Sequence, residues 1–252
     1  MKKLTPEFIG WFHGFLDGDG YLGHTRNTKF IKWEINFNLS NRDKDLLYLM
    51  KESLNIGNIS ELKTQKDIKR YRISSAKEIK NKILPIIDKD NLFTKHIYWQ
   101  FKQAHILIEN NIKLFDEKPL LDMDADIPNL TKERILQNPN FHNWLIGFFE
   151  AELAFYVSGN RAGWSVTQTN NPLVLEAIKE YMNVNAKILI DHRNGTNQRL
   201  SSESIKDVQK KINIISSSNK AKLLGYKKLQ YNKWCFNLSN IPKYKNLNIQ
   251  YL

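Results

Sequence analysis

Residues 8–22 read FIGWFHGFLDGDGYL, and residues 141–155 read FHNWLIGFFEAELAF. A constant offset aligns Trp11 with Trp144 and Gly14 with Gly147. Each stretch is an apolar run that ends in two carboxylates separated by one small residue, as Asp17-Gly18-Asp19 and Glu150-Ala151-Glu152. A tryptophan, a glycine and two acids repeated at the same spacing indicate that the chain has two-fold internal symmetry.

The spacing inside each stretch predicts a helix. Aromatic residues of the first stretch recur on one helix face, at Phe8, Trp11, Phe12 and Phe15. Glycines recur at every fourth residue on another stripe, at Gly10, Gly14 and Gly18. Because glycine inside a helix costs about 1 kcal/mol relative to alanine, the stripe predicts that the two helices pack closely against each other. The acids at the helix ends would then converge, where the negative end of each dipole disfavours them. Asp19 and Glu152 are therefore expected to bind cations.

At these residues the chain resembles the LAGLIDADG homing endonucleases in their double-motif, single-chain form. GFLDGDG (14–20) matches the motif closely, and GFFEAEL (147–153) matches it up to its last residue. The resemblance extends over most of the chain and includes KILPII (82–87), FTK (93–95) and LLGYKKLQY (223–231). It is strongest to the fungal mitochondrial group I intron members, some of which also act as RNA maturases. The resemblance implies a monomer that binds a double-stranded DNA site.

The composition agrees with a nucleic-acid partner. The net charge of +12 points to a polyanion, although a generically basic protein would also fit the charge alone. The one cysteine, Cys235, excludes an internal disulfide and a cysteine-rich zinc site. No apolar run reaches the length of a membrane span, and the first residues do not read as a targeting peptide. Abundant Asn, Lys and Ile, which have AT-rich codons, favour a mitochondrial gene.

The order of elements predicts an α+β fold of two pseudo-symmetric repeats, at 1–115 and 141–252, joined by a linker at 116–140. Alternating apolar residues predict a strand at 30–40. The other expected elements of the first half are a helix at 43–54, strands at 58–65 and 69–75 around Lys66-Asp67, and helices at 76–87 and 94–110. A short helix at 132–137 is expected in the linker. The second half should contain strands near 155–158 and 164–167, a helix at 172–182, a hairpin turn at Asn194-Gly195 and helices at 203–215 and 219–236.

The polar faces of these strands are expected to form a saddle that tracks a DNA duplex. A two-stranded ribbon fits the major groove. The candidate contacts are Lys32, Asn36, Asn38, Lys63, Arg70, Arg72, Arg161, Gln198 and Arg199. For any single strand, an ordinary solvated face remains the alternative.

The motif acids predict metal-dependent phosphodiester hydrolysis. Hard divalent cations held by carboxylates activate water and neutralise the scissile phosphate. We expect Asp19 and Glu152 to hold Mg²⁺, with Mn²⁺ as a substitute. The resemblance adds the backbone carbonyls of Gly18 and Ala151 as ligands. One acid from each motif gives one centre for each strand, and hence a double-strand break.

Two further readings concern the remaining acids. Asp17 and Glu150 point to a different side of each helix and are expected to cap or pack neighbouring segments. A calcium loop beginning at Asp17 is excluded, because Tyr21 and Thr28 would occupy its fifth and twelfth positions.

The resemblance also implies three polar residues beside the acids. Lys227 matches the basic residue that lies near the attacking water in this family. Lys95 is expected to be its counterpart in the first half, although the spacing to the next aromatic residue differs by one. Gln168 matches a polar residue at the edge of the active site, with Ser40 as its expected partner by symmetry.

Leu153 departs from the motif, which has glycine at this position. If the backbone needed a positive φ there, leucine would be strained by roughly 1–2 kcal/mol and would crowd the metal pocket. The second centre is therefore expected to be weaker, so that the enzyme nicks one strand. A centre without activity would leave the alternative function, a group I intron RNA maturase that binds RNA and assists splicing.

Overall fold

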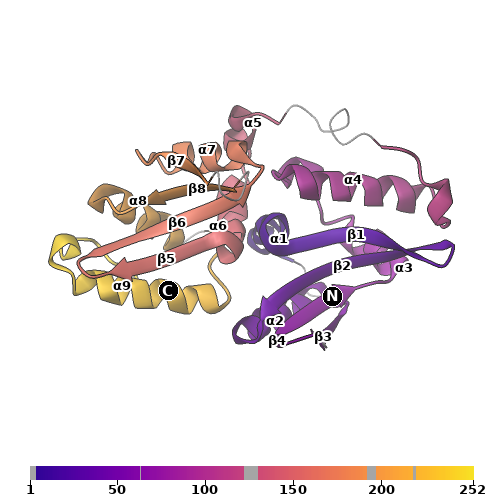
Figure 1. The fold of residues 1–252 in the computed structure, drawn as a ribbon, viewed down its shortest axis with the longest axis horizontal. Coiled ribbons are helices and arrows are strands. Elements are labelled where there is room, and N and C mark those ends of the chain that lie inside the picture. The colour runs from indigo at the N-terminus through magenta and orange to yellow at the C-terminus, as the bar shows by residue number, and fades with distance from the viewer. Residues whose placement is uncertain (1–3, 63, 122–129, 192–196, 218–219) are drawn as a thin grey trace.

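The computed structural model describes residues 4–62, 64–121, 130–191, 197–217 and 220–252 and shows two repeats side by side (Figure 1). The first repeat contains α1 (Pro6–Asp19), β1 (Gly20–Asn27), β2 (Phe30–Ser40), α2 (Lys44–Leu54), β3 (Asn58–Leu62), β4 (Gln65–Ile73), α3 (Ala76–Glu78) and α4 (Lys95–Glu109). After α5 (Lys132–Gln137), the second contains α6 (Phe141–Glu152), β5 (Leu153–Ser158), β6 (Arg161–Thr169), α7 (Pro172–Tyr181), β7 (Ile188–Asp191), β8 (Asn197–Ser202), α8 (Ile205–Ile215) and α9 (Tyr226–Ser239).

The two sheets have the same topology. Their strand orders are β1-β2-β4-β3 and β5-β6-β8-β7, and all neighbouring strands are antiparallel. In each repeat a motif helix leads directly into the outer strand of the first hairpin. This repetition confirms the predicted α+β fold with two pseudo-symmetric halves.

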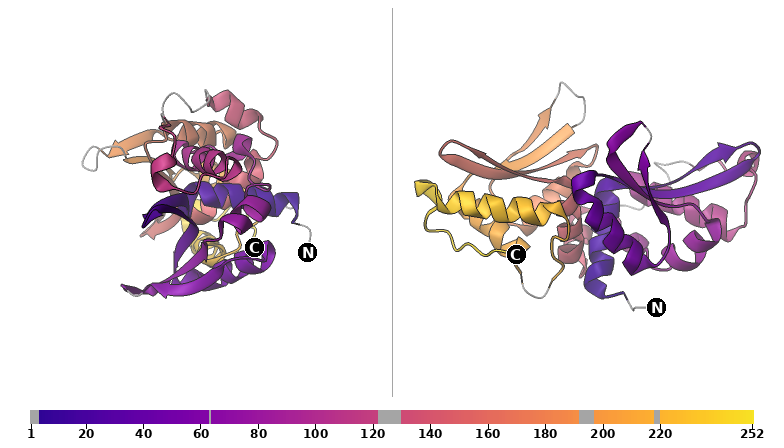
Figure 2. Two further views of the ribbon diagram at one scale, coloured as in Figure 1. Left: turned by 90° about the vertical axis from the view of Figure 1, so that its right-hand side faces the viewer. Right: turned by 90° about the horizontal axis from the view of Figure 1, so that it is seen from below.

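The sheets lie on one side of the molecule and most helices lie on the other (Figure 2, right). The motif helices α1 and α6 pack against each other at the centre, between the two sheets. The buried apolar side chains of both repeats join in one core, which includes Trp11 of α1 and Trp144 of α6. The paired helices therefore fix how the two saddle halves are placed.

Glycine makes this close helix pairing possible. A Cβ atom added to Gly14 would lie 1.8 Å from the carbonyl oxygen of Trp144, and one added to Gly147 would lie 1.8 Å from that of Trp11. Near the helix ends, a Cβ on Gly18 would lie 2.4 Å from the Cβ of Ala151. The backbones touch at Gly14 and Gly147, and at Gly18 the backbone lies against the small side chain of Ala151, as the glycine stripe predicts.

Several predicted boundaries agree with the structure, and three are wrong. The strand at 30–40 and the linker helix at 132–137 occur as β2 and α5. The helix expected at 76–87 is only α3 (Ala76–Glu78), which a π-helical turn at Ile79–Ile83 continues. The turn between the second pair of strands does not lie at Lys66-Asp67, because β4 already begins at Gln65, which pairs with Leu62. Helix α9 begins at Tyr226 and not near 219, because the backbone N–H groups of Leu224 and Gly225 bind the side chain of Glu150.

Part of the predicted organisation falls on residues 122–129 and 192–196, outside the described residues. The turn at Asn194-Gly195 is one such case. The division into 1–115, 116–140 and 141–252 stays a prediction. None of the helices in the described residues is long and apolar enough to span a membrane.

Candidate active site

Asp19 and Glu152 end the two paired helices and lie near each other. Desolvation raises the pKa of Asp19 to about 6, against the attraction of Lys227 and with a further contribution from Asp43. Desolvation also raises the pKa of Glu152 to about 7, and the negative charge of Asp19 adds to this rise. Two carboxylates that disfavour each other's ionisation form a place where a cation would stabilise both.

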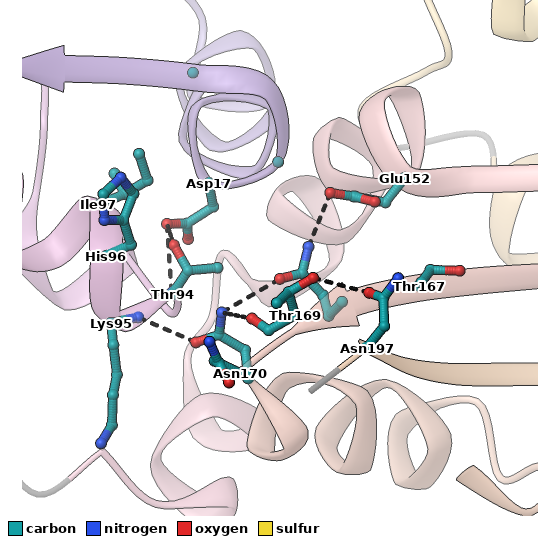
Figure 3. Close-up of a pocket in the computed structure, with 14 residues that line it drawn as sticks. Asp17, Thr94, Lys95, His96, Ile97, Glu152, Thr167, Thr169, Asn170 and Asn197 are labelled. Carbon is teal, nitrogen blue, oxygen red and sulfur yellow. Dashed lines mark hydrogen bonds between the residues drawn. The ribbon is translucent and has the colours of Figure 1, made fainter. Parts of the chain in front are cut away.

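An open pocket beside Glu152 is lined by residues from both repeats (Figure 3). Gln168 donates from Nε2 to Oε1 of Glu152 over 2.9 Å and fixes the orientation of that carboxylate. Gly18, from the opposite motif helix, also lines this pocket. The structure thus brings Gln168 and Gly18 together with Glu152, as expected.

The first acid of each motif caps a helix of its own repeat. Asp17 accepts hydrogen bonds from the backbone N–H groups of Phe93 and Thr94, and from Nε1 of Trp144. Glu150 accepts in the same way from the N–H groups of Leu224 and Gly225, at 2.6 and 3.1 Å. The expected capping role of both acids is confirmed. Each motif thereby sets the position of the last helix of its repeat, α4 or α9.

Two hydrogen bonds between the repeats extend this arrangement. The carboxylate of Asp43, just before α2, accepts from the backbone N–H of Tyr226 over 2.9 Å. The amide oxygen of Asn171, just before α7, accepts from the backbone N–H of Lys95 over 3.3 Å. Each repeat therefore binds the first residue of the other repeat's helix. Sequence reasoning missed Asp43, although its place before the second helix of its repeat matches that of Asn171.

Lys227 lies at the Asp19 side of the site. Its ammonium donates to the backbone oxygen of Leu153 over 2.5 Å. Burial lowers its pKa, whereas the carboxylates of Glu150, Asp43 and Asp19 act in the opposite direction. The structure therefore brings Lys227 to the motif acids, as expected from the resemblance.

Lys95 is not the counterpart of Lys227. It lines the pocket beside Glu152, but its side chain extends away from that carboxylate (Figure 3). Lys95 follows the capped residues directly, as Tyr226 does in the second repeat, whereas Lys227 comes one position later. The residue that matches Lys227 in this register is His96, which the sequence comparison missed by one position.

Ser40 is likewise not the partner of Gln168. Gly20 pairs with Phe37 and Leu153 pairs with Val166, so that Phe37 and Val166 are equivalent. Two residues further along, the position of Gln168 is taken by Leu39, whose side chain is buried. The two halves therefore differ at this position, because an amide in the second repeat corresponds to an apolar side chain in the first.

Leu153 is neither strained nor among the residues that line the pocket beside Glu152. Its backbone is extended, with φ −79° and ψ 130°, close to the φ of −82° and ψ of 160° at Gly20. The side chain is only 1% exposed and belongs to the core. The expectation of a strained second motif was wrong, because the chain leaves the helix through extended backbone that any residue can adopt.

Most of the predicted DNA contacts lie on strands of the two sheets. Asn36 pairs with Arg72 and Asn38 with Arg70, so these four share the face of the sheet that also carries Glu34. Glu34 contacts Arg70 and Arg72 at 3.4 Å each and holds both guanidinium groups in place. Lys32 shares this face by strand alternation.

The second sheet repeats part of this face. Arg199 pairs with Thr167, as Arg70 pairs with Asn38, and Arg161 lies on the same face by alternation. Gln198 does not belong to it, because neighbouring residues of a strand point to opposite faces and Gln198 pairs with Gln168. Lys63 lies outside the described residues.

The oxygen donors at the motif acids suit Mg²⁺. In the part of the chain that the structure describes, no three His, Cys, Asp or Glu side chains are grouped as a complete metal centre. Mg²⁺ commonly uses one or two protein carboxylates and completes its shell with water and substrate phosphate. Two carboxylates beside the facing backbones of Gly18 and Ala151 fit such an open site.

Comparisons with known proteins show which proteins the chain is similar to. Residues 12–106 match the family model described as LAGLIDADG endonuclease. The chain is 28% identical over 264 residues to the probable intron-encoded endonuclease Cox1-I1b of Schizosaccharomyces pombe, covering 97% of this chain and 66% of that protein. It is 27% identical over 237 residues to the uncharacterized mitochondrial protein RF1 of Saccharomyces cerevisiae, covering 91% of this chain and 48% of that protein. The chain thus spans about two thirds of one relative and about half of the other.

Solved structures share the whole fold. I-SmaMI, bound to uncleaved DNA in the presence of calcium ions, has a TM-score of 0.72 at 21% identity, over 97% of this chain and 93% of that chain. The LAGLIDADG homing endonuclease I-LtrWI, bound to target DNA, has a TM-score of 0.68 at 20% identity, over 93% and 90%. Residues 12–106 are therefore a LAGLIDADG domain, and the chain as a whole has the two-repeat fold of the double-motif LAGLIDADG homing endonucleases.

Proposed function

We propose that the chain is a site-specific endonuclease that hydrolyses double-stranded DNA with Mg²⁺, or with Mn²⁺ in its place. The observation that carries this proposal is the convergence of Asp19 and Glu152 at the ends of two helices that touch through glycine. These acids lie at the junction of two sheets whose polar faces carry arginine (Figure 2). A duplex that follows both sheets would pass the acids at its middle.

The residues at the two helix ends would bind the metal ions and assist hydrolysis. Asp19 and Glu152, with the backbone carbonyls of Gly18 and Ala151, would hold divalent cations. The cations would supply an activated water and neutralise charge on the scissile phosphate. Gln168 keeps the Glu152 carboxylate oriented through its hydrogen bond. Lys227 places a positive charge beside Asp19, where it can stabilise the phosphate in the transition state.

The sheets would position the DNA. The residues that we propose for this contact are Lys32, Asn36, Asn38, Arg70, Arg72, Arg161 and Arg199, to which Lys63 is added from the sequence alone. Arg70 and Arg199 hold equivalent places in the two sheets. They would therefore contact the two halves of the target site in equivalent ways.

We further propose that the gene lies in a mitochondrial group I intron and that the protein acts as a monomer. The relatives named above, one intron-encoded and one mitochondrial, support the origin. One chain that already contains both motif helices supports the monomer. The target would then be the sequence that joins the two exons at the intron insertion point.

The direct experiment compares the parent with Asp19→Asn on such a DNA in Mg²⁺. We expect the parent to cleave, and the variant to lose cleavage while it keeps its fold and its DNA affinity. Glu52→Gln, at an exposed acid of α2, is the matched control and should cleave like the parent. Cleavage in EDTA, or full activity of Asp19→Asn, would contradict the proposal.

The RNA maturase alternative stays a prediction, although the strain at Leu153 that led to it is absent. Leu153 is accommodated in extended backbone and therefore no longer supports this alternative. Faster splicing of the host intron RNA by a parent protein that cuts no DNA would establish the alternative instead.

A further inference from the structure

The two catalytic centres differ in their basic residue. We propose that His96 is a catalytic residue of the centre at Glu152, in the place that Lys227 has in the centre at Asp19. This inference rests on the proposed nuclease function. It makes the centre at Glu152 the slower one, because the His96 ring offers a single N–H donor where Lys227 offers a flexible amino group with several donors.

Three consecutive contacts fix the register that places His96. In the first repeat, Asp17 binds the N–H groups of Phe93 and Thr94, and Asn171 binds that of Lys95. In the second repeat, Glu150 binds Leu224 and Gly225, and Asp43 binds Tyr226. The next residue is His96 in one repeat and Lys227 in the other. No insertion separates the two series.

The surroundings of His96 agree with this placement. It lines the same pocket as Glu152 and Gln168, and it is exposed to solvent there (Figure 3). A substrate phosphate bound in this pocket would therefore share it with both side chains. Lys95 is also exposed, but its side chain extends away from Glu152.

A buried amide holds the imidazole ring. The side-chain oxygen of Gln100, one turn further along α4, accepts from the backbone N–H of Leu22 over 2.9 Å. Because that N–H can only donate, the NH₂ group of Gln100 faces Nε2 of His96 at 2.6 Å. Nε2 must then accept, which leaves Nδ1 as the ring's N–H donor. A ring held in this way can donate a hydrogen bond from Nδ1 to an anionic oxygen.

The test measures the two strands separately. A duplex target carries a different label on each strand, and single-turnover rate constants are measured with saturating protein in Mg²⁺. The parent should cut one strand more slowly. His96→Ala should slow that strand by at least about tenfold and leave the other within about twofold. His96→Lys should speed the slow strand, and Lys227→Ala should slow the other one.

Controls separate this role from folding and from DNA binding. His105→Ala removes an exposed histidine of the same helix and should leave both rates unchanged. DNA affinity should not change in His96→Ala, and the melting temperature should fall only slightly, because the exposed ring contributes one hydrogen bond to Gln100. If Lys95 were instead the counterpart of Lys227, Lys95→Ala would slow the cleavage of one strand and His96→Ala would not.

The outcomes are distinct. Strand-specific loss in His96→Ala supports the proposal. Loss in Lys95→Ala alone, equal slowing of both strands by His96→Ala, or no effect of His96→Ala overturns it while the nuclease function stands. A parent that cuts neither strand overturns both.

Discussion

Alanine at Gly14 or Gly147 should separate the two motif helices. The added carbon would lie 1.8 Å from a backbone oxygen of the opposite helix, where real contacts are at least 3.0 Å. For Gly14 a second backbone atom, the nitrogen of Phe148, would be 2.7 Å away. A backbone cannot rotate out of the way as a side chain can, so the helices must move apart by roughly 1 Å.

Whether these glycine-to-alanine variants gain or lose stability shows which effect dominates, helix propensity or the clash between the two helices. Propensity alone favours alanine over glycine by about 1 kcal/mol. Overpacking typically costs about 1–3 kcal/mol, and a clash with backbone atoms of the opposite helix puts this case at the upper end. For a chain of this size each kcal/mol lowers Tm by about 2–4 °C. We expect a net fall of at least several degrees for each variant.

Thermal unfolding followed by circular dichroism measures this change, and strand cleavage is measured in parallel. Gly10→Ala serves as a graded control, because its nearest clash is with a side-chain carbon of Asn143 at 2.6 Å. It should lose less stability than Gly14→Ala. Cleavage should fall further than stability does, because the helices carry Asp19 and Glu152. A Tm for Gly14→Ala equal to or above that of the parent would refute the packing argument.

Other predictions follow from the same structure. Leu153→Gly should lower the free energy of unfolding by about 2–5 kcal/mol, because the side chain is buried. The variant should not raise double-strand cleavage. Higher cleavage by the variant at low Mg²⁺ would restore the interpretation that Leu153 strains the second motif. DNA affinity should fall steeply with salt, with a log–log slope near −9 for about ten phosphate contacts; titrations between low and moderate salt that give a slope near −2 would show that the sheets are not the binding face. The raised pKa of Glu152, about 7, means that the folded protein holds this proton more tightly than the unfolded chain, so the metal-free parent loses stability as pH rises through that value. Glu152→Gln should therefore gain Tm relative to the parent between pH 5 and pH 8 in EDTA, and a constant difference across this range would count against the buried pair of acids.

The motif helices and their acids were predictable because their signal is local. The repeated Trp11 and Trp144, the glycine stripe and the strand at 30–40 all express the period of one element. The structure has these features because each spacing pattern follows from side chains that must be buried or from a helix backbone that must pack closely against another helix.

The pairing of residues between the repeats was not predictable in this way. Whether His96 or Lys95 matches Lys227 depends on which N–H groups the motif acids bind, and those contacts join residues more than 70 positions apart. The match of Leu39 to Gln168 depends on strand register. The face of Gln198, by contrast, followed from strand alternation and could have been assigned from the sequence.

The central claim is that the motif acids hold a divalent metal between the two helix ends. Anomalous scattering from Mn²⁺ in crystals of the complex with uncleaved target DNA tests it most directly. We predict Mn²⁺ density against the carboxylate oxygens of Asp19 and Glu152, and loss of the Asp19 contact in crystals of Asp19→Asn. Bound DNA in the saddle without Mn²⁺ density at either acid would contradict the account.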